Sequence, residues 1–318
     1  MAKTGIIILE YNNWEDTLNC IESVLKFNTA PIKFIVVDNA SSQKNVIRNL
    51  KSGLLNLFPK FKESDLIYNH NNSIKEITLV LSKENKGYAC GNNIGLEVAY
   101  KDPDISHIMI LNSDILFVED IIPTLLNDLK DDTAIVSPVL FKKELTEIDK
   151  NCARRELTAN EIIKLHIPFP ADPFKISEKK KIPITLNSGL MQIDLPSGSC
   201  MLARKSLFQQ IDGFDPNTFL YYEEDILSKK IKNLGLKNYL NTNLKCIHLG
   251  ATTTKHSASR FIVNKSSQSA KYVLRQYYES NKFQNCIMSL FLKLIDLRIF
   301  LIVILKKIFD RNKYEKWK

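Results

Sequence analysis

The sequence lacks paired cysteines. Its six cysteines are scattered singly, and no Cys-x-x-Cys motif occurs. Zinc knuckles and small disulfide-bonded domains need cysteines at short, regular spacings, so the pattern excludes both classes. Unpaired cysteines are typical of a reducing compartment, so we expect a cytoplasmic protein. Residues 1–5 also lack the apolar segment and the cleavage site of a signal peptide, in line with that expectation.

The glycine motifs of two large nucleotide-binding classes are missing as well. Neither Gly-x-Gly-x-x-Gly nor Gly-Lys followed by Ser or Thr occurs in the chain. These motifs bring backbone amides against a pyrophosphate or a triphosphate. Their absence disfavours a dinucleotide-dependent enzyme of the Rossmann type and a P-loop NTPase.

A long apolar run is also absent. Residues 287–309 are strongly apolar, but Lys293, Asp296 and Arg298 interrupt them and leave seven apolar residues in a row before Lys306. A helix that spans a membrane needs about 20. We therefore expect an amphipathic helix on an anionic membrane surface; the alternative is a helix packed on the rest of the chain or on another subunit. The side chains expected near lipid phosphates are Lys306, Lys307, Arg311 and Lys313.

Charge of one sign is in excess only near the C-terminus. The net charge is +9, but residues 255–318 carry 14 basic and 4 acidic side chains, whereas the other 254 residues carry 30 and 31. The hydrophobic content of 44% and charged content of 25% are those of an ordinary globular protein. We expect a folded domain over residues 1–255 and a basic, helical, amphipathic extension over residues 256–318.

A strand that ends in a carboxylate organises the middle of the chain. Residues 108–111 (Ile-Met-Ile-Leu) run directly into Asn112 and Asp114. A short apolar run with polar ends predicts a buried strand of a parallel sheet. Ligands of open α/β sheets bind beyond the carboxyl ends of strands, so Asp114 is placed to hold a divalent cation and its diphosphate. The alternative is that Asn112 and Asp114 only cap the following helix.

The N-terminal part repeats this arrangement. Residues 5–9 and 34–37 predict two strands, and a helix from about residue 16 that ends before Pro31 joins them. Such a β-α-β unit is parallel and right-handed. Asp38 directly follows the second strand and is placed to accept hydrogen bonds from a ribose or a base; the alternative is a cap for a helix near Lys44–Leu50.

A third strand, residues 77–81, leads into a segment rich in glycine and asparagine. This segment, residues 84–95, precedes a helix expected over residues 96–100. Glycines before a helix predict a close approach of the backbone to a ligand. Further along, the proline-rich residues 141–190 predict loops, and no chemistry follows from them.

Three consecutive carboxylates, Glu223, Glu224 and Asp225, begin a helix that is expected to end at Gly235. Acids at a helix N-terminus have a plain explanation, because they interact favourably with the helix dipole. However, the aromatic and aliphatic residues 219–222 directly precede them. We expect a partly dry setting in which crowded like charges raise one carboxylate pKa, as suits a general base.

In combination and in order, these segments resemble family 2 glycosyltransferases with a GT-A fold. The likeness is greatest to the branch of rhamnosyl- and galactofuranosyltransferase-like enzymes that build bacterial surface polysaccharides, and it covers residues 4–252. The segments that carry it are 8–12 (Ile-Leu-Glu-Tyr-Asn), 37–41 (Val-Asp-Asn-Ala-Ser), 85–93 (Asn-Lys-Gly-Tyr-Ala-Cys-Gly-Asn-Asn), 111–114 (Leu-Asn-Ser-Asp), 198–202 (Gly-Ser-Cys-Met-Leu), 213–215 (Gly-Phe-Asp), 219–224 (Phe-Leu-Tyr-Tyr-Glu-Glu) and His248.

The resemblance implies a site for a nucleotide-sugar donor. Tyr11 and Asp38 look like the contacts to the base and the ribose, and Asn92 or Asn93 is expected near the nucleotide or the donor sugar. Asn112 stands where the family has the first acid of its Asp-x-Asp motif. One carboxylate must therefore anchor the metal ion.

The resemblance also implies the catalytic groups. Asp114 looks like the metal carboxylate and His248 like a late metal ligand, for Mn²⁺ or Mg²⁺. Glu224 falls at the position of the catalytic base, with Asp225 as the alternative. The residues expected at the junction of the donor and acceptor sites are Gly198 and Ser199.

The implied function is an inverting, metal-dependent transfer of a hexose or deoxyhexose from a nucleoside diphosphate to a saccharide acceptor that is lipid-linked. We expect a peripheral enzyme of surface polysaccharide synthesis, such as O-antigen or capsule, at the inner face of the plasma membrane, with no nucleic-acid partner. One alternative is a sugar-1-phosphate nucleotidylyltransferase, but residues 10–14 offer no glycine-rich basic loop. The other is a basic nucleic-acid-binding protein, but long aliphatic runs separate the charges of the tail.

Overall fold

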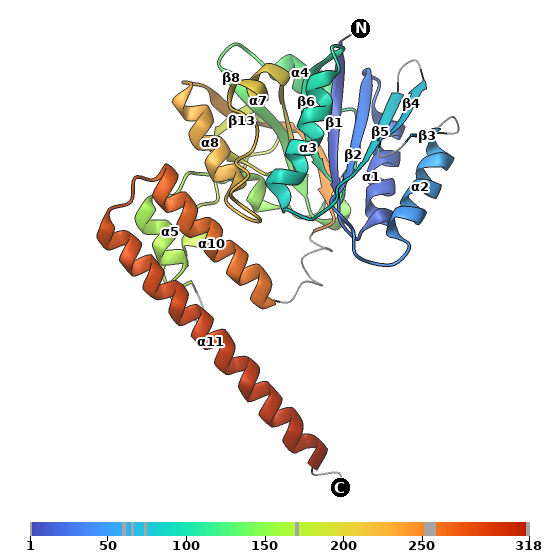
Figure 1. Ribbon diagram of the computed structural model, residues 1–318. Helices are drawn as coiled ribbons and strands as arrows, with labels where there is room; N and C mark the ends of the chain where they lie inside the picture. The colour runs from blue at the N-terminus through green and yellow to red at the C-terminus, as the bar shows by residue number, and fades with distance from the viewer. Residues whose placement is uncertain are drawn as a thin grey trace.

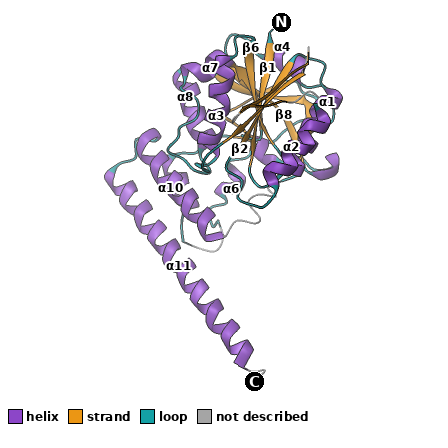
Figure 2. Cartoon of the chain, turned by 45° about the vertical axis from the view of Figure 1, so that its right-hand side comes forward, coloured by secondary structure: helices purple, strands orange, loops and turns teal. Residues whose placement is uncertain are grey.

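The computed structural model describes residues 2–58, 62–64, 67–72, 75–168, 172–250 and 259–315. Within these residues, eleven strands form one mixed sheet with helices on both faces (Figure 1; Figure 2). Its strands are β1 (Lys3–Glu10), β2 (Ile32–Asp38), β3 (Lys62–Ser64), β4 (Ile67–Asn72), β5 (Lys75–Leu81), β6 (Ile105–Asn112), β7 (Ile115–Phe117), β8 (Thr133–Phe141), β10 (Leu190–Ile193), β12 (Cys200–Arg204) and β13 (Lys237–His248). The predicted α/β fold, a mixed sheet flanked by helices, is confirmed.

The sheet has the order β10-β13-β8-β12-β6-β1-β2-β5-β4-β3, and β7 pairs with β13 beside this path. The neighbours β5, β2, β1 and β6 are all parallel. Their apolar side chains are buried by helices on both faces, which explains why these strands read as continuous apolar runs. Because parallel strands share one carboxyl edge, the register places Glu10 opposite Asp38 and Leu9 opposite Asn112. The polar strand ends are therefore brought together at one edge.

Two groups of helices cover the faces of the sheet (Figure 1). One face packs against α1 (Trp14–Phe27), α2 (Val46–Leu57) and α4 (Ile122–Asp128). The other packs against α3 (Tyr88–Lys101), α7 (Lys205–Gln210) and α8 (Glu223–Asn233). The helix α1 shows the apolar spacing expected of a surface helix, with Cys20, Ile21 and Val24 buried.

The helix α3 begins earlier than the sequence suggests. It was expected over residues 96–100, but it starts at Tyr88 and contains Gly91 and Gly95. A Cβ atom at Gly95 would lie 2.5 Å from the Ile7 side chain, and one at Gly91 would overlap Leu9. These two glycines therefore let α3 pack closely on β1. The close neighbour of these two glycines is thus the sheet, and the approach of a ligand to the segment 84–95 stays a prediction.

Residues 142–188, between β8 and β10, contain short elements instead of the expected loops alone. They are η1 (Lys143–Leu145), η2 (Lys150–Cys152), β9 (Ala153–Arg154), α5 (Ala159–Leu165) and α6 (Ile176–Lys179). The two-residue strand β9 pairs with β11 (Leu195–Pro196) in a separate small sheet. A capping box between Thr158 and Glu161 starts α5.

Two C-terminal helices, α10 (Ser259–Tyr277) and α11 (Lys282–Glu315), complete the described chain. Their buried residues Ala270, Leu274 and Met288 form a small apolar core with Ile162 and Ile163 of α5. The C-terminal helices are thus packed against the segment 142–188, and α11 projects away from the sheet (Figure 1). The predicted domain boundary at residue 255 lies outside the described residues.

The helix α10 also contacts the loop in front of α8. Asp215 accepts hydrogen bonds from the hydroxyls of Tyr272, at 2.8 Å, and Tyr277, at 2.6 Å. The hydroxyl of Ser269 donates to the carbonyl of Leu220 at 3.0 Å. Burial disfavours the charged form of Asp215, but the hydrogen bonds from Tyr277, Asn217 and Tyr272 hold its pKa below the usual value. The C-terminal helices are therefore fastened to the loop that leads into the acidic triplet.

Candidate active site

The first feature of the site is the buried carboxylate at the end of β2. Asp38 Oδ2 accepts a hydrogen bond from the amide of Ser41 at 3.2 Å, while Oδ1 has no hydrogen-bond partner among the described residues. Burial raises the pKa of Asp38. The next helix, α2, has Asn45 as its N-cap, so Asp38 is not the cap of that helix. An unpaired buried oxygen at a strand end leaves Asp38 free for a ligand, as its predicted role requires.

The loop after β1 lies beside Asp38. Asn12, which has a positive φ of 58°, receives a hydrogen bond at its amide oxygen from the Gln43 backbone and donates its own backbone N–H to Ser41. The loops that follow β1 and β2 are thus tied together. Tyr11 is half-buried next to this contact, and its role in base binding stays a prediction.

The second feature is a close pair formed by Asp114 and His248. We call it the cation pair, because these two residues are the predicted ligands of a divalent cation. Asp114 lies in the turn between β6 and β7, and His248 is the last residue of β13. The strands β7 and β13 are antiparallel with Ile115 opposite His248, so the register brings the two side chains together. His248 Nε2 lies 3.3 Å from Asp114 Oδ2. Asp114 does not cap α4, whose N-cap is Ile121.

A third residue, Asp149, holds the histidine of the cation pair. Asp149 Oδ2 lies 2.9 Å from His248 Nδ1. Burial alone would lower the pKa of His248, but its two carboxylate neighbours raise it to about 9. Sequence analysis missed Asp149, because it comes from the segment 142–188 and no local pattern links it to residue 248.

The cation pair fits a divalent metal ion. Two ligands in adjacent positions of an octahedral ion lie about 3 Å apart, close to the observed 3.3 Å. Asp149 supplies the carboxylate that usually orients a metal-binding imidazole through its other nitrogen. In the described part of the chain, no group of three or more His, Cys, Asp or Glu side chains is arranged to hold a metal ion. A divalent ion held by Asp114 and His248 would take its remaining ligands from substrate phosphates and water.

The third feature is the acidic triplet at the start of α8. Glu223 and Asp225 are buried, and burial raises their pKa values to about 8 and about 6. The Glu224 side chain is 20% exposed, and its Oε1 accepts a hydrogen bond from the backbone N–H of Gly198 at 3.0 Å. Of the three acids, Glu224 is thus the one that a substrate can reach. Tyr221 and Tyr222, both with positive φ, turn the chain into the helix.

Gly198 and Ser199 connect the cation pair to the acidic triplet. The amide of Asn112 donates to the carbonyl of Ser199 at 2.8 Å, and the two side chains approach to 3.4 Å. Asn112 is two residues before Asp114, and Gly198 contacts Glu224 directly. Ser199 therefore contacts a neighbour of the predicted metal ligand Asp114, and Gly198 contacts the predicted base.

The two asparagines of α3 make contacts within the protein. Asn93 pairs with the backbone of Phe214 through two hydrogen bonds of 2.8 and 2.9 Å, so its amide holds the loop 213–215. Asn92 donates to the carbonyl of Tyr88, and its Oδ1 has no hydrogen-bond partner in the described chain. Their contact with the donor stays a prediction.

Comparison with known proteins agrees with this architecture. The family model described as "Glycosyl transferase family 2" matches residues 5–212, which is more than half of the chain. The protein therefore belongs to glycosyltransferase family 2. This confirms the family and the enzyme class, a glycosyltransferase, that the sequence indicated.

Two curated relatives and one solved structure are similar to the chain. The low-salt glycan biosynthesis hexosyltransferase Agl10 of Haloferax volcanii is 27% identical over 69% of this chain and 58% of the relative. The rhamnosyltransferase WbbL of Escherichia coli K12 is 24% identical over 64% of this chain and 77% of the relative. A crystal structure of GalNAc-T7 with UDP, GalNAc and Mn²⁺ matches with a TM-score of 0.59 and 14% identity, over 86% of this chain and 48% of that one. The chain thus spans only about half to three quarters of these proteins.

Proposed function

We propose that the protein is an inverting glycosyltransferase that moves a sugar from a nucleoside diphosphate to a hydroxyl group of a saccharide acceptor. One observation carries the proposal. Asn112, two residues before Asp114, contacts Ser199, and the adjacent Gly198 donates its N–H to Glu224. This chain of contacts supports a donor diphosphate near Asp114 and His248 and an acceptor hydroxyl near Glu224, at the carboxyl ends of the parallel strands.

In this proposal the reaction is a single displacement. Glu224 takes the proton of the acceptor hydroxyl, and the acceptor oxygen bonds to the anomeric carbon. The bond from that carbon to the diphosphate breaks, and its electron pair leaves with the nucleoside diphosphate. Asp114 and His248 would hold a divalent cation, which would supply Lewis-acid stabilisation of the leaving group's negative charge. Only one of the three acids is partly exposed, which supports one base and inversion over a two-carboxylate mechanism.

The identity of the substrates is proposed at the level of chemical class. The names of the curated relatives support a hexose or deoxyhexose as the transferred sugar, and the structural relative that holds UDP and Mn²⁺ supports Mn²⁺ or Mg²⁺ as the cofactor. The unpaired Oδ1 of Asp38 supports a donor nucleotide at the β2 end. The family assignment favours this function over the two alternatives raised by the sequence.

Nucleotide binding provides the first test. A thermal-shift panel of UDP, dTDP, GDP, CMP and NAD, each with Mn²⁺ and with EDTA, should show stabilisation by one nucleoside diphosphate that EDTA removes. Transfer is then measured with sugars of that nucleotide. Glu224→Gln should keep the thermal shift and lose transfer, whereas Glu97→Gln, a matched change at an exposed position of α3, should keep both. Full transfer by Glu224→Gln would contradict the base assignment.

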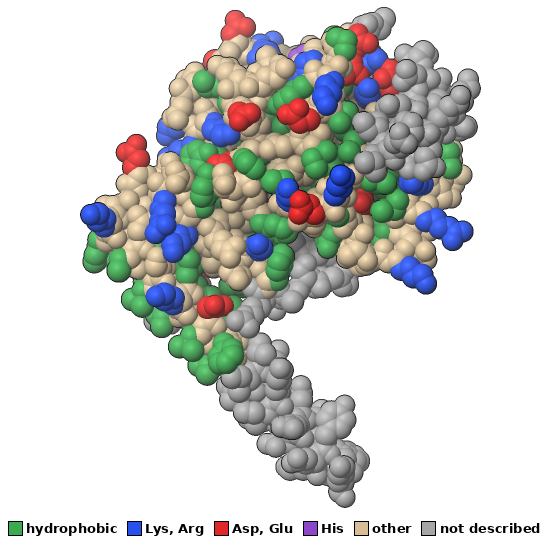
Figure 3. All heavy atoms as spheres, viewed as in Figure 1, with side chains coloured by type: hydrophobic (Ala, Val, Ile, Leu, Met, Phe, Trp, Pro, Cys, Tyr) green, Lys and Arg blue, Asp and Glu red, His purple; other side chains and the backbone are tan. Residues whose placement is uncertain are grey.

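We also propose that α11 lies on a membrane surface, where a lipid-linked acceptor would be found. No helix in the described ranges is long and apolar enough to cross a membrane. Leu290, Leu294, Leu297 and Leu301 follow helical spacing and are 40–54% exposed. Figure 3 shows hydrophobic and basic side chains together over the C-terminal helices at the lower left. The side chains of the predicted lipid-facing lysines and arginine after residue 301 lie outside the described part.

Vesicle binding tests the membrane proposal. The protein should sediment with vesicles that contain phosphatidylglycerol and less with pure phosphatidylcholine, because basic residues add an electrostatic contribution. Replacing Leu290, Leu294 and Leu297 by serine should reduce sedimentation at least tenfold. Leu55→Ser is the control, because Leu55 is 45% exposed on α2, far along the chain from α11. Unchanged vesicle binding of the triple variant, or a change of its oligomeric state alone, would contradict the proposal.

A further inference from the structure

A cation from the segment 142–188 reaches the candidate base. Arg154 is the last residue of β9, and its side chain is 13% exposed. Its Nη2 atom donates to the carbonyl of Pro196 at 3.1 Å and lies 3.6 Å from Glu224 Oε1. The same oxygen accepts the N–H of Gly198. Both contacts therefore fall on Oε1, and Oε2 receives no hydrogen bond from any residue that the structure describes.

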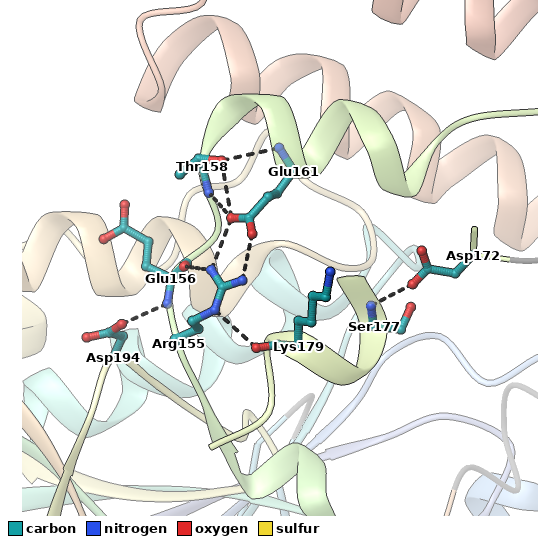
Figure 4. Close-up of polar contacts among 8 residues, drawn as sticks. All are labelled: Arg155, Glu156, Thr158, Glu161, Asp172, Ser177, Lys179 and Asp194. Carbon is teal, nitrogen blue, oxygen red and sulfur yellow. Dashed lines mark hydrogen bonds and ion pairs between the residues drawn. The ribbon is translucent and has the colours of Figure 1, made fainter. Parts of the chain in front are cut away.

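The neighbouring Arg155 fixes the backbone that presents Arg154. Figure 4 shows the guanidinium of Arg155 held by both carboxylate oxygens of Glu161, at 2.6 and 3.0 Å, and by the carbonyl of Lys179, at 3.1 Å. Arg155 directly follows β9, so its anchoring fixes the backbone next to Arg154. Pairing of β9 with β11 holds Arg154 itself, which lies opposite Leu195.

The charges around Glu224 come from three parts of the chain. They are Arg154 on β9, Lys180 after α6, and Glu223 and Asp225 on α8, and the neutral hydroxyl of Tyr88 on α3 completes the surroundings. Burial lowers the pKa of Lys180, and so does the nearby Arg154 cation, while Asp225 and Glu224 act against this. Two cations therefore face an acidic triplet in a mostly buried setting. Of the two, Arg154 is the one that contacts the accessible acid.

We propose that Arg154 is a positioning residue for Glu224. Its guanidinium holds Oε1, so that Oε2 is left to face the acceptor hydroxyl and take its proton. This inference rests on the proposed role of Glu224 as base. It gives the segment 142–188, for which the sequence indicated no chemistry, a part in positioning the base.

The test is the pH dependence of transfer by Arg154→Gln and Arg154→Lys. Arg154→Gln removes the cation that contacts Glu224 Oε1, so the acid limb of its kcat/KM profile should move upward. Its loss of activity should then be several-fold larger at pH 6 than at pH 8.5. Arg154→Lys keeps a cation and should restore most of the profile. Arg48→Gln, at an exposed position of α2, should change nothing.

A uniform loss of activity at all pH values, with an unmoved acid limb, would overturn the inference, because a purely structural role predicts that result. Nucleotide-induced thermal stabilisation of each variant reports folding independently of transfer. Glu224→Gln, measured in parallel, separates the two proposals. If it is inactive and Arg154→Gln shows no shift, only the role of Arg154 fails; if it is active, the base assignment fails.

Discussion

Gly198→Ala is the substitution whose effect on the site follows most directly from the structure. A Cβ atom at this position would lie 2.6 Å from Glu224 Oε1 and 3.0 Å from the Tyr88 hydroxyl. Ordinary contacts of a Cβ atom are about 3.4 Å or longer, so the carboxylate must shift by about 0.8 Å. The hydrogen bond from the Gly198 N–H, now 3.0 Å long, would then be lost or badly stretched.

The expected cost follows from the charge of the acceptor. A hydrogen bond to an ionised group contributes about 1.5–3 kcal/mol. If this bond aligns Glu224 in the transition state, its loss lowers kcat roughly 10- to 150-fold. In the proposed function the donor binds at Asp38, Asp114 and His248, so donor binding should change little. The backbone at Gly198 needs no positive φ, and the variant can therefore fold.

The assay is steady-state transfer with the donor class that the thermal-shift panel identifies. Gly53→Ala is the matched control: Gly53 lies in α2, and a new Cβ there would overlap the Leu18 side chain instead of a residue of the candidate site. We expect the control to keep its kcat, whatever its change in stability. A Gly198→Ala protein with wild-type kcat would refute the reasoning that this contact aligns the base.

Three further predictions concern stability and metal binding. Burial raises the pKa of Glu10 to about 7 in the folded protein, whereas the unfolded chain releases this proton near pH 4.5, so the free energy of unfolding falls as the pH rises between these values. Glu10→Gln lacks this proton, and its free energy of unfolding should therefore increase relative to wild type by about 3 kcal/mol between pH 5 and pH 8, measured by urea unfolding. Asp149→Asn should weaken Mn²⁺ binding 10- to 100-fold in calorimetric titrations with nucleotide present, and an unchanged affinity would exclude its role in orienting His248. Gly91→Ala should lower the unfolding free energy by about 1–3 kcal/mol, because its Cβ overlaps Leu9 in the core; an unshifted melting temperature would contradict this packing.

The parts of the site that the sequence predicts are those at the ends of regular elements. Asp38 and Asp114 follow apolar runs that form strands, and the acidic triplet begins a helix, so periodicity locates them. The structure then places them along one edge, as the parallel topology requires. The fold, a sheet flanked by helices, follows from the same pattern.

What the sequence does not predict depends on contacts between distant segments. Asp149 and Arg154 come from residues 142–188, where short elements and prolines leave no period to interpret. Their partners are 99 and 70 residues further along the chain, at His248 and Glu224. The neighbours of the glycines in α3 could not be predicted for a related reason. A glycine suits a close approach to a ligand or to a packed side chain, and only the folded chain shows that Leu9 and Ile7 are the neighbours.

The start of α8 is held by three separate parts of the chain. The turn before β12 contributes the Gly198 amide, the segment 142–188 contributes Arg154, and α10 fastens the preceding loop through Asp215 and Leu220. The segment and the C-terminal helices also share one apolar core. A displacement of α10 or α11 would therefore act on the loop that positions the acidic triplet. In the proposed function, these contacts connect the helix that faces the membrane to the base. The same packing would therefore position both the acceptor and the carboxylate that activates it.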